Sequence, residues 1–280
     1  FEASQVLLLD NIRQNSREIK NDKGLALSLS KGFDYYVNDA FAVCHRRQTS
    51  VVAVTRHLSS YAGFLIKKEI ENLDRAVRAP AEGKILVLGG AKISTKLPVI
   101  KNFIDKTEKI FIGGALANDF WKARGINVGM SVVDDSVSPD VKGENIFLPS
   151  DFWAGIKNGD ADSAKLYSKI TSVSSEEAIL DIGSETAAEW AKMIEKTRMV
   201  IWNGPMGYFE VDNFNKGTEV IARAVAKAGY SVIGGGDTIA AASKFGLLDK
   251  YDFVSTGGGA MLEFLAGNKL PGLEALGYYN

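Results

Sequence analysis

Residues 84–96 of the chain, KILVLGGAKISTK, contain the pattern that decides the fold. Residues 85–88 are an apolar run without polar alternation, two glycines follow at once, and the next residues have helical spacing. Such a run is typical of a strand that is buried on both faces, as in parallel sheets covered by helices. The stretch therefore predicts one strand–loop–helix unit of an α/β fold.

The same unit recurs toward the carboxyl end of the chain. In each copy a short apolar run leads into a glycine-rich loop, and a segment of helical periodicity follows. The further copies begin with KIFIGG at 109–114, RMVIWNGPMG at 198–207, YSVIGGG at 230–236 and DFVSTGGG at 252–259. We therefore expect residues 84–280, tail included, to form a doubly wound parallel sheet of the Rossmann-like α/β class.

The amino-terminal residues show the same pattern with fewer strands. QVLLLD at 5–10 and DYYVNDAF at 34–41 predict strands, and KGLALSLSKG at 23–32 predicts a helix. These strands are too few to cover their own faces, so we expect residues 1–61 to be the remnant of a truncated α/β domain. Residues 62–83 have helical spacing up to a proline and predict an interdomain helix and linker.

Composition and charge exclude several classes of protein and site. A net charge of −1 provides no field that would attract nucleic acid or an acidic membrane. No apolar run approaches the ~18 residues of a membrane span. Cys44 is the single cysteine, which suits a reducing cytoplasm, and with two histidines it excludes a Cys/His zinc site. We expect a cytoplasmic monomer that binds neither nucleic acid nor membrane.

The glycine-rich strand ends predict where a ligand binds. Ligands of open parallel sheets bind at the carboxyl ends of the strands, where free N–H groups at helix starts attract phosphate. Tight packing explains one such turn as readily as a ligand does, but a series on successive strands favours a phosphate-bearing ligand. The chain has no GxxxxGK[ST] and no full GxGxxG after a strand, which disfavours P-loop nucleotidases and dinucleotide oxidoreductases.

Charged residues lie beside these loops, and each has a structural alternative. Lys92 and Lys96 are four apart at a helix start, so they are either solvated surface lysines or phosphate contacts. Two positive charges at the positive end of a helix dipole carry a cost that a bound anion would offset, so this position favours the interpretation as phosphate contacts. Asp237 follows three glycines and either caps a helix or binds Mg²⁺. Glu210, in a loop, is either solvated or accepts hydrogen bonds from a ribose.

Arginines follow two of the amino-terminal strands. Arg13 follows the first predicted strand, and Arg46 follows the second. Guanidinium groups at adjacent strand ends suit the bidentate capture of phosphate or carboxylate. An exposed salt-bridge network is the equally open alternative. His45, beside Arg46, is more readily explained as a structural residue than as a general base.

The order of these motifs resembles the phosphoglycerate kinase family over essentially the whole chain. The matching segments are LLLDNIR, YVNDAFAVCHR, AGFLIKKE, GGAKISTK, the LP of FLPSD, LDIGSET, VIWNGPMGYFE, GGGDT, STGGGAMLEFLAG and LPGLEAL. The resemblance implies a glycolytic phosphotransferase with a carboxyl group as acceptor, 1,3-bisphosphoglycerate + ADP ⇌ 3-phosphoglycerate + ATP, with Mg²⁺. It also implies that residues 84–280 bind the nucleotide and that residues 1–61 belong to the phosphoglycerate-binding domain.

The resemblance implies roles for particular residues. Arg13 and Arg46 match the arginines that bind phosphoglycerate. The catalytic positions that it implies are Lys92, Lys96, Gly257 and Gly258. The nucleotide-binding positions that it implies are Lys96, Gly113, Gly114, Glu210, Gly235, Gly236, Asp237 and Thr238. The metal would be held by Asp237.

The chain departs from the family pattern in single residues and in one longer stretch. Ala42 and Ala115 replace glycines, Ser184 replaces a proline, and HRRQTS replaces HRAHSS. The family's first strand, an arginine-bearing loop and an HLGR-like loop contact phosphoglycerate in the family, and none of them is found here. The alternative function is therefore a truncated Mg-ADP/ATP-binding module with little or no transfer activity.

Overall fold

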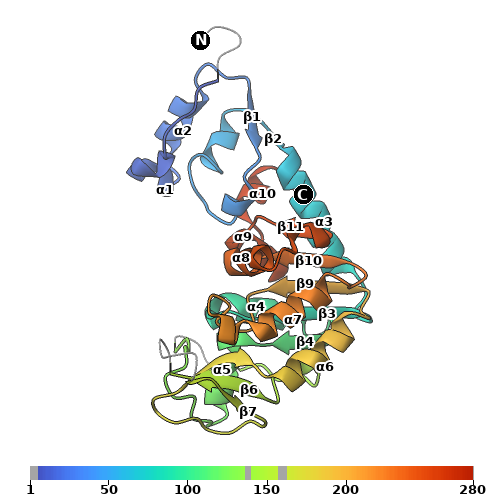
Figure 1. Ribbon diagram of the computed structural model, residues 1–280. Coiled ribbons are helices and arrows are strands. Elements are labelled where there is room, and N and C mark those ends of the chain that lie inside the picture. Colours follow the sequence, from blue (N-terminus) through green and yellow to red (C-terminus); the bar gives the residue numbers. More distant parts are fainter. Residues whose placement is uncertain (1–5, 136–139, 157–162, 280) are drawn as a thin grey trace. The chain divides into compact units, whose positions relative to one another are not determined.

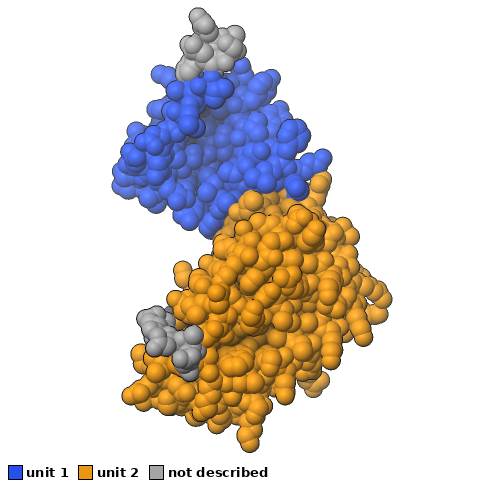
Figure 2. Space-filling model, in the orientation of Figure 1, with its two compact units in different colours: residues 1–68, 269–280 blue, residues 69–268 orange. Residues whose placement is uncertain are grey.

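The chain divides into two compact units (Figure 2). The computed structural model describes residues 6–135, 140–156 and 163–279. Unit 1 comprises Phe1–Lys68 and Lys269–Asn280, and unit 2 comprises Glu69–Asn268. Helix α3 (Phe64–Arg78) contains the boundary between them.

Unit 2 is built on a parallel sheet of six strands in the order β11-β10-β9-β3-β4-β5 (Figure 1). Every neighbouring pair in this sheet is parallel. The central strands β3 and β9 are buried throughout, as their unbroken apolar runs require. The strands are β3 (Lys84–Leu88), β4 (Lys109–Ile112), β5 (Ile146–Phe147), β9 (Met199–Asn203), β10 (Ser231–Gly234) and β11 (Phe253–Ser255). The predicted fold class is confirmed.

Helices cover both faces of this sheet. On one face Phe111 stacks on Trp190 of α6, with ring centroids 4.7 Å apart, and Trp202 lies in the same core cluster. Helices α6 and α7 pack against each other there, and α4 and α9 form another packed pair. The helices of this unit are α4 (Ile93–Phe103), α5 (Gly114–Ala123), α6 (Ser184–Ile194), α7 (Lys216–Val225), α8 (Gly236–Lys244) and α9 (Gly259–Leu265). The unit also contains two short 3-10 helices, η5 (Asp212–Phe214) before α7 and η6 (Leu248–Lys250) after α8.

A second, antiparallel sheet lies between α5 and α6 in the sequence, and the sequence analysis assigned no strand there. It consists of β6 (Phe152–Gly155), β7 (Lys165–Tyr167) and β8 (Ala178–Ile182), in the order β7-β6-β8. An irregularity between Trp153 and Ala154 shifts the register of β6 on β8. Strands this short carry little periodic signal, and their pairing is what stabilises them.

Unit 1 contains a two-stranded parallel sheet of β1 (Tyr35–Asn38) and β2 (Ser59–Ala62). Residues 6–10 form neither helix nor strand, and Val6 and Leu8 are about nine-tenths exposed, so the strand predicted at 5–10 is wrong for its described residues. A strand needs a hydrogen-bonded neighbour, and none pairs with it in the described chain. The helices are α1 (Ser16–Ile19), α2 (Lys23–Ser30) and α10 (Pro271–Ala275), with 3-10 helices η1 (Ile12–Gln14), η2 (Phe41–Val43) and η3 (Ala53–Arg56).

The carboxyl-terminal tail packs in unit 1, whereas the sequence analysis included it in the domain of residues 84–280. Gly272 N–H donates to the Cys44 carbonyl at 2.8 Å. A Cβ on Gly272 would lie 2.9 Å from the Cα of Cys44, so only glycine permits this approach. Leu270 and Leu273 are buried beside it. The tail is thus attached by contacts that span most of the sequence, which local patterns do not encode.

Candidate functional site

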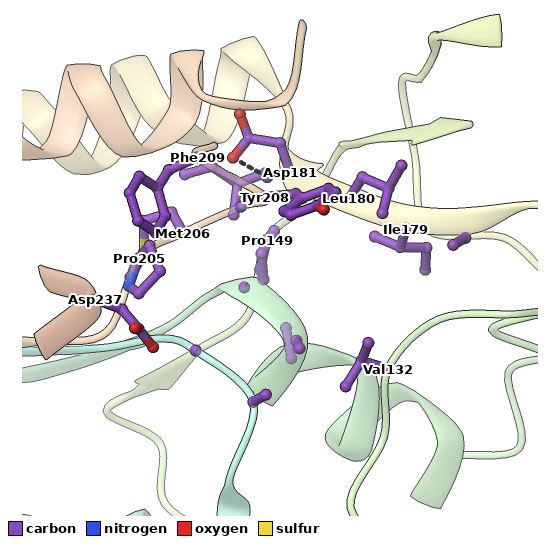
Figure 3. Close-up of a pocket in the computed structure, with 18 of the residues that line it drawn as sticks. Val132, Pro149, Ile179, Leu180, Asp181, Pro205, Met206, Tyr208, Phe209 and Asp237 are labelled. Atoms are coloured by element: carbon purple, nitrogen blue, oxygen red, sulfur yellow. Dashed lines mark hydrogen bonds between the residues drawn. The ribbon is translucent and has the colours of Figure 1, made fainter. Parts of the chain in front are cut away.

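A cavity of about 330 Å³ opens in unit 2 at the carboxyl ends of the parallel strands (Figure 3). The chain runs from β3 outward to β4 and β5, and later from β9 outward to β10 and β11, so the strand order reverses between β3 and β9. Ligands of open α/β sheets bind at such a reversal. The cavity is lined by the loops after β3 and β9, by α5 and α8, which follow β4 and β10, and by β8.

The cavity has one apolar and one charged end. Figure 3 places Val132 and Ile179 at one end, with Leu180 and Pro149 between, and Asp237 beside Pro205 at the other. The indole of Trp121 also lines the wall. A volume of this size and a mostly apolar lining with few polar groups are usual for small-molecule sites. The arrangement suits a flat aromatic group at one end and an anionic group with its cation at the other.

Lys96 is buried at the charged end, with 7% of the residue exposed. Burial lowers the pKa of its ammonium to about 8. The Asp237 carboxylate acts in the opposite direction and raises this pKa, whereas the charge of Lys92 lowers it. Its Nζ lies 3.3 Å from the position that a Cβ on Gly90 would take, so the ammonium faces the loop after β3. A buried cation is costly unless an anion accompanies it. The interpretation of Lys96 as a solvated surface residue is therefore wrong.

Lys92 differs from Lys96 although the two are one helical turn apart. It occupies the N-cap position of α4 and is exposed. In the first turn of the helix the Ser94 hydroxyl donates to Asp134 Oδ2 at 3.0 Å. The Thr95 hydroxyl donates to the Lys92 carbonyl at 3.0 Å, so the Lys92 ammonium takes no part in these bonds. Lys92 thus lies at the start of the helix with its charge free to meet an anion from solvent.

Asp237 lies in the first turn of α8, and Gly235 is the N-cap residue of that helix. The alternative that Asp237 caps the helix is therefore wrong, and its carboxylate lines the cavity instead. The neighbouring Thr238 is fully buried, and its Oγ1 accepts from Gly204 N–H at 2.6 Å. Its hydroxyl thus faces the loop after β9, and its contact with a nucleotide stays a prediction.

Five of the six glycines singled out in the sequence fall into two groups. A Cβ on Gly113 would lie 2.6 Å from the Met206 sulfur, and one on Gly114 would lie 2.5 Å from the Pro205 carbonyl oxygen. Close packing of neighbouring loops therefore explains these two, and the same holds for Gly235, which meets the Asn203 side chain. By contrast, a Cβ on Gly236 or Gly258 would meet no atom within 4 Å, so these open positions can admit a ligand.

Glu69 on α3 is a site-supporting residue that the sequence analysis missed. It is fully buried and accepts hydrogen bonds from the Ser255 hydroxyl at 2.7 Å and from Thr256 N–H at 2.7 Å. Gly257 N–H in turn donates to the Ser255 hydroxyl. The loop that carries Gly257 and Gly258 is therefore fixed to α3. A signal existed, because Glu69 is three residues after Ile66 and four before Leu73, on the apolar face of the helix.

The predicted arginines belong to unit 1, whereas the residues that line the cavity belong to unit 2. Arg13 and Arg46 are both exposed. The neighbouring Arg47 forms an ion pair with Glu274 at 3.2 Å. The segments that carry Arg13 and Arg46 are joined through buried Glu18, whose carboxylate accepts from the Ser50 N–H and hydroxyl. Glu18 is a second supporting residue that the sequence analysis missed.

Comparison of the sequence with known proteins finds relatives along nearly all of the chain. The sequence model of the phosphoglycerate kinase family matches residues 1–268. The phosphoglycerate kinase of Moorella thermoacetica is 43% identical over 99% of this chain and 72% of the relative's length. That of Thermomicrobium roseum is 40% identical over 99% of this chain and 73% of the relative's length.

Solved structures agree with this assignment. The structure of phosphoglycerate kinase from Coxiella burnetii matches with a TM-score of 0.85 and 38% identity, over 96% of this chain and 72% of that one. The phosphoglycerate kinase of Pyrococcus horikoshii matches with a TM-score of 0.81 and 35% identity, over 95% of this chain and 71% of that one. Identity at this level over almost the full sequence, with the same fold, leads to one conclusion: the chain belongs to the phosphoglycerate kinase family.

Proposed function

We propose that this chain is a glycolytic phosphoglycerate kinase, which transfers a phosphoryl group reversibly between ATP and the carboxylate of 3-phosphoglycerate. The observation that carries the proposal is the cavity at the reversal of strand order: Asp237 lines its charged end, and the buried Lys96 has its Nζ beside Gly90, which also lines the cavity. The apolar end suits an adenine base, and the charged end suits the phosphates of ADP or ATP. Membership of the family supports the same substrates.

The chemistry requires charge and alignment more than proton transfer. The acceptor carboxylate has a pKa near ~4 and is ionised at pH 7, so the reaction needs no general base. The difficulty is to bring two polyanions together, and cationic side chains and helix N-termini lower that barrier. Lys96 and Lys92 would contact the transferred group and the nucleotide phosphates, with Gly257 and Gly258 at the start of α9. Arg13 and Arg46 would bind phosphoglycerate.

The donor set at the charged end fits Mg²⁺. Asp237 offers a carboxylate that lines the cavity, and carboxylate oxygen is the ligand type that Mg²⁺ prefers. Bound Mg²⁺ would neutralise part of the charge on the nucleotide phosphates. Gly236 has open space around it, which favours phosphate approach to the start of α8. Glu210, exposed at the cavity, would accept hydrogen bonds from the ribose.

Two measurements on the 280-residue chain test the proposal. Calorimetry should detect binding of Mg-ADP and none of NAD, and a coupled assay should detect ATP formation from 1,3-bisphosphoglycerate and ADP. Binding without transfer would favour the nucleotide-binding module, and failure to bind Mg-ADP would contradict both. No helix in the described part of the chain is long and apolar enough to cross a membrane. A cytoplasmic location and a monomeric state are part of the proposal, and light scattering tests the latter.

A further inference from the structure

The loop after β9, residues 204–212, is held at its start by α8. This β9 loop supplies residues 205–210 of the cavity wall, Glu210 among them. Gly204 N–H donates to the Thr238 hydroxyl in the first turns of α8. Farther along, Met206 N–H and Gly207 N–H both donate to the Thr218 hydroxyl of α7, at 3.0 and 3.1 Å. The first half of the loop is thus fixed by two buried threonines.

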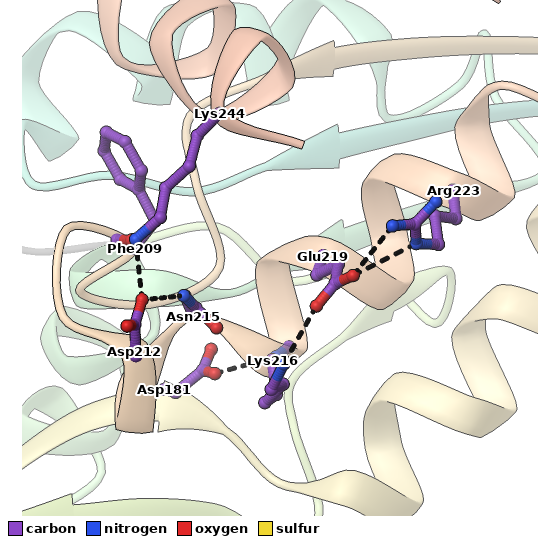
Figure 4. Close-up of polar contacts among 9 residues, drawn as sticks. Asp181, Phe209, Asp212, Asn215, Lys216, Glu219, Arg223 and Lys244 are labelled. Carbon is purple, nitrogen blue, oxygen red and sulfur yellow. Dashed lines mark hydrogen bonds and ion pairs between the residues drawn. The ribbon is translucent and has the colours of Figure 1, made fainter. Parts of the chain in front are cut away.

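The end of the β9 loop is held by the opposite end of the same helix. Lys244, in the last turn of α8, points its Nζ at the loop (Figure 4). It donates to the Phe209 carbonyl at 3.0 Å, to the Glu210 carbonyl at 3.4 Å and to Asp212 Oδ1 at 3.0 Å. An ammonium group has three N–H donors, so these three acceptors satisfy all of them.

Two of these contacts fix the backbone at Glu210 itself. A hydrogen bond to a carbonyl restrains the position of the peptide, and so the direction in which the side chain leaves it. Lys244 and Thr238 are six residues apart, about 9 Å along a helix. Asp237 is adjacent to Thr238, so α8 places Asp237 at one end of the β9 loop and Glu210 at the other. One helix therefore sets the distance between the two acids.

We propose that Lys244 is a positioning residue for nucleotide binding, which holds the end of the β9 loop against α8 and thereby keeps Glu210 at a fixed distance from Asp237. The inference rests on the proposed function, in which Glu210 contacts the ribose and Asp237 the metal. Lys244 would thus affect the affinity for nucleotide indirectly, because all three of its N–H groups donate to oxygens of the β9 loop.

A general structural role for Lys244 is the competing explanation. A lysine in the last turn of a helix also stabilises that helix through its dipole. That role would change the stability of the protein but not its affinity for ADP once the protein is folded. Lys216 is the matched control, because it is a lysine on the neighbouring α7 that pairs with Glu219 on its own helix (Figure 4).

The test is calorimetry of Mg-ADP binding to the 280-residue chain and its variants. Lys244→Met should weaken binding about ten-fold, which corresponds to about 1.4 kcal/mol. Lys244→Arg should restore most of the affinity, and Lys216→Met should bind like the unaltered chain. Asp212→Asn removes one acceptor of Lys244 and should weaken binding less than Lys244→Met. The amides of residues 205–211 should exchange hydrogen faster in Lys244→Met than in Lys216→Met.

A double-substitution cycle separates positioning from general support. In a Glu210→Gln background, Lys244→Met should weaken binding further by less than about two-fold, because the residue that it positions is already altered. If Lys244→Met lowered the affinity equally in the unaltered and the Glu210→Gln backgrounds, the inference would be overturned. Unchanged affinity in both Lys244→Met and Asp212→Asn would also overturn it. If the unaltered chain bound no Mg-ADP, the proposed function itself would fail. Binding that is intact but indifferent to Lys244 would overturn this inference alone.

Discussion

Two buried lysines at opposite ends of one strand–helix unit have similar titration behaviour and different surroundings. Lys84 begins β3, is fully buried and donates to the Ala76 and Val77 carbonyls at 3.0 and 3.1 Å. Lys96 lies on α4 beside the cavity and faces Asp237. Burial lowers the pKa of both to about 8. The shift in pKa therefore does not identify the functional lysine, and the surroundings do.

The difference follows from what each ammonium can bind. The acceptors of Lys84 are fixed carbonyls at the end of α3, where a helix leaves its last C=O groups without intrahelical partners. Its charge also lies near the aromatic ring of Phe103. Lys96 has its Nζ beside Gly90, which lines the cavity, and it interacts with an acid on another helix. We therefore expect Lys84 to stabilise the fold and Lys96 to bind an anionic ligand.

The largest expected effect follows from substitution of Lys96. Lys96→Met should weaken nucleotide binding or lower phosphoryl transfer by about 2 kcal/mol or more, because a charged partner of the phosphates is lost. The thermal stability of the ligand-free variant should not fall at neutral pH, because burial of the Lys96 charge costs stability there. Calorimetry with Mg-ADP and a coupled transfer assay measure the two effects. Unchanged affinity and unchanged turnover would remove Lys96 from the site and make the two lysines alike.

A smaller effect, of a different kind, is expected for Lys84. Lys84→Met should lower the free energy of unfolding by about 1.5 kcal/mol, because the buried carbonyls of Ala76 and Val77 lose their donor. Mg-ADP affinity should be retained. Denaturant titration gives the stability, and calorimetry on the folded variant gives the affinity. A variant as stable as the unaltered chain but weaker for ADP would reverse the assignment of the two lysines.

Asp237 is the acid that distinguishes the surroundings of Lys96 from those of Lys84. Asp237→Asn should reduce the Mg²⁺ dependence of nucleotide binding by about 1 kcal/mol or more, as expected for a lost charged ligand. It should leave stability nearly unchanged, because Gly235 and not Asp237 caps α8. Titration of ADP with and without Mg²⁺, next to a melting curve, measures both. A loss of stability at unaltered Mg²⁺ dependence would indicate a structural role.

The smallest expected effect is a difference between the two lysines in proton uptake when Mg-ADP binds. At pH 8 the ammonium of Lys96 is partly deprotonated, and bound phosphate should raise its pKa. Mg-ADP binding at pH 8 should therefore take up a fraction of a proton, and the uptake should vanish in Lys96→Met and persist in Lys84→Met. Calorimetry in buffers of different ionisation enthalpy measures it. Equal uptake in all three proteins would mean that Lys96 does not sense the ligand.

Both lysines also affect how stability depends on pH in the ligand-free protein. Their folded pKa values are near 8, below the value of about 10.4 for an unfolded lysine. Between these values the unfolded chain binds more protons, so stability gains from each lysine as the pH rises from about 8 toward 10. Saturating Mg-ADP should remove the contribution of Lys96 and leave that of Lys84.

The sequence predicted those parts of the site that depend on neighbouring residues. Strands β3, β4, β9, β10 and β11 of the doubly wound sheet appear as apolar runs with a glycine loop and a helix after each, although the helix after β9 begins only at Lys216. The short strand β5 was not predicted. Lys96 and Asp237 could be singled out because each is at a helix start next to such a loop. The role of Thr238 as the acceptor of Gly204 N–H could not, since the two residues are 34 positions apart.

What the sequence by itself determined is the fold class, the location of the loops at one edge of the sheet, and the family. These follow from local periodicity, from chain reversal at glycines and from motif order. Only the tertiary structure decided that Lys96 is buried, that Glu69 holds Ser255 across 186 positions, that Lys244 holds the β9 loop, and that residues 6–10 form no strand. Each of these depends on a partner distant in sequence. A local pattern specifies which face of an element is buried, but only the folded chain supplies the group that meets it.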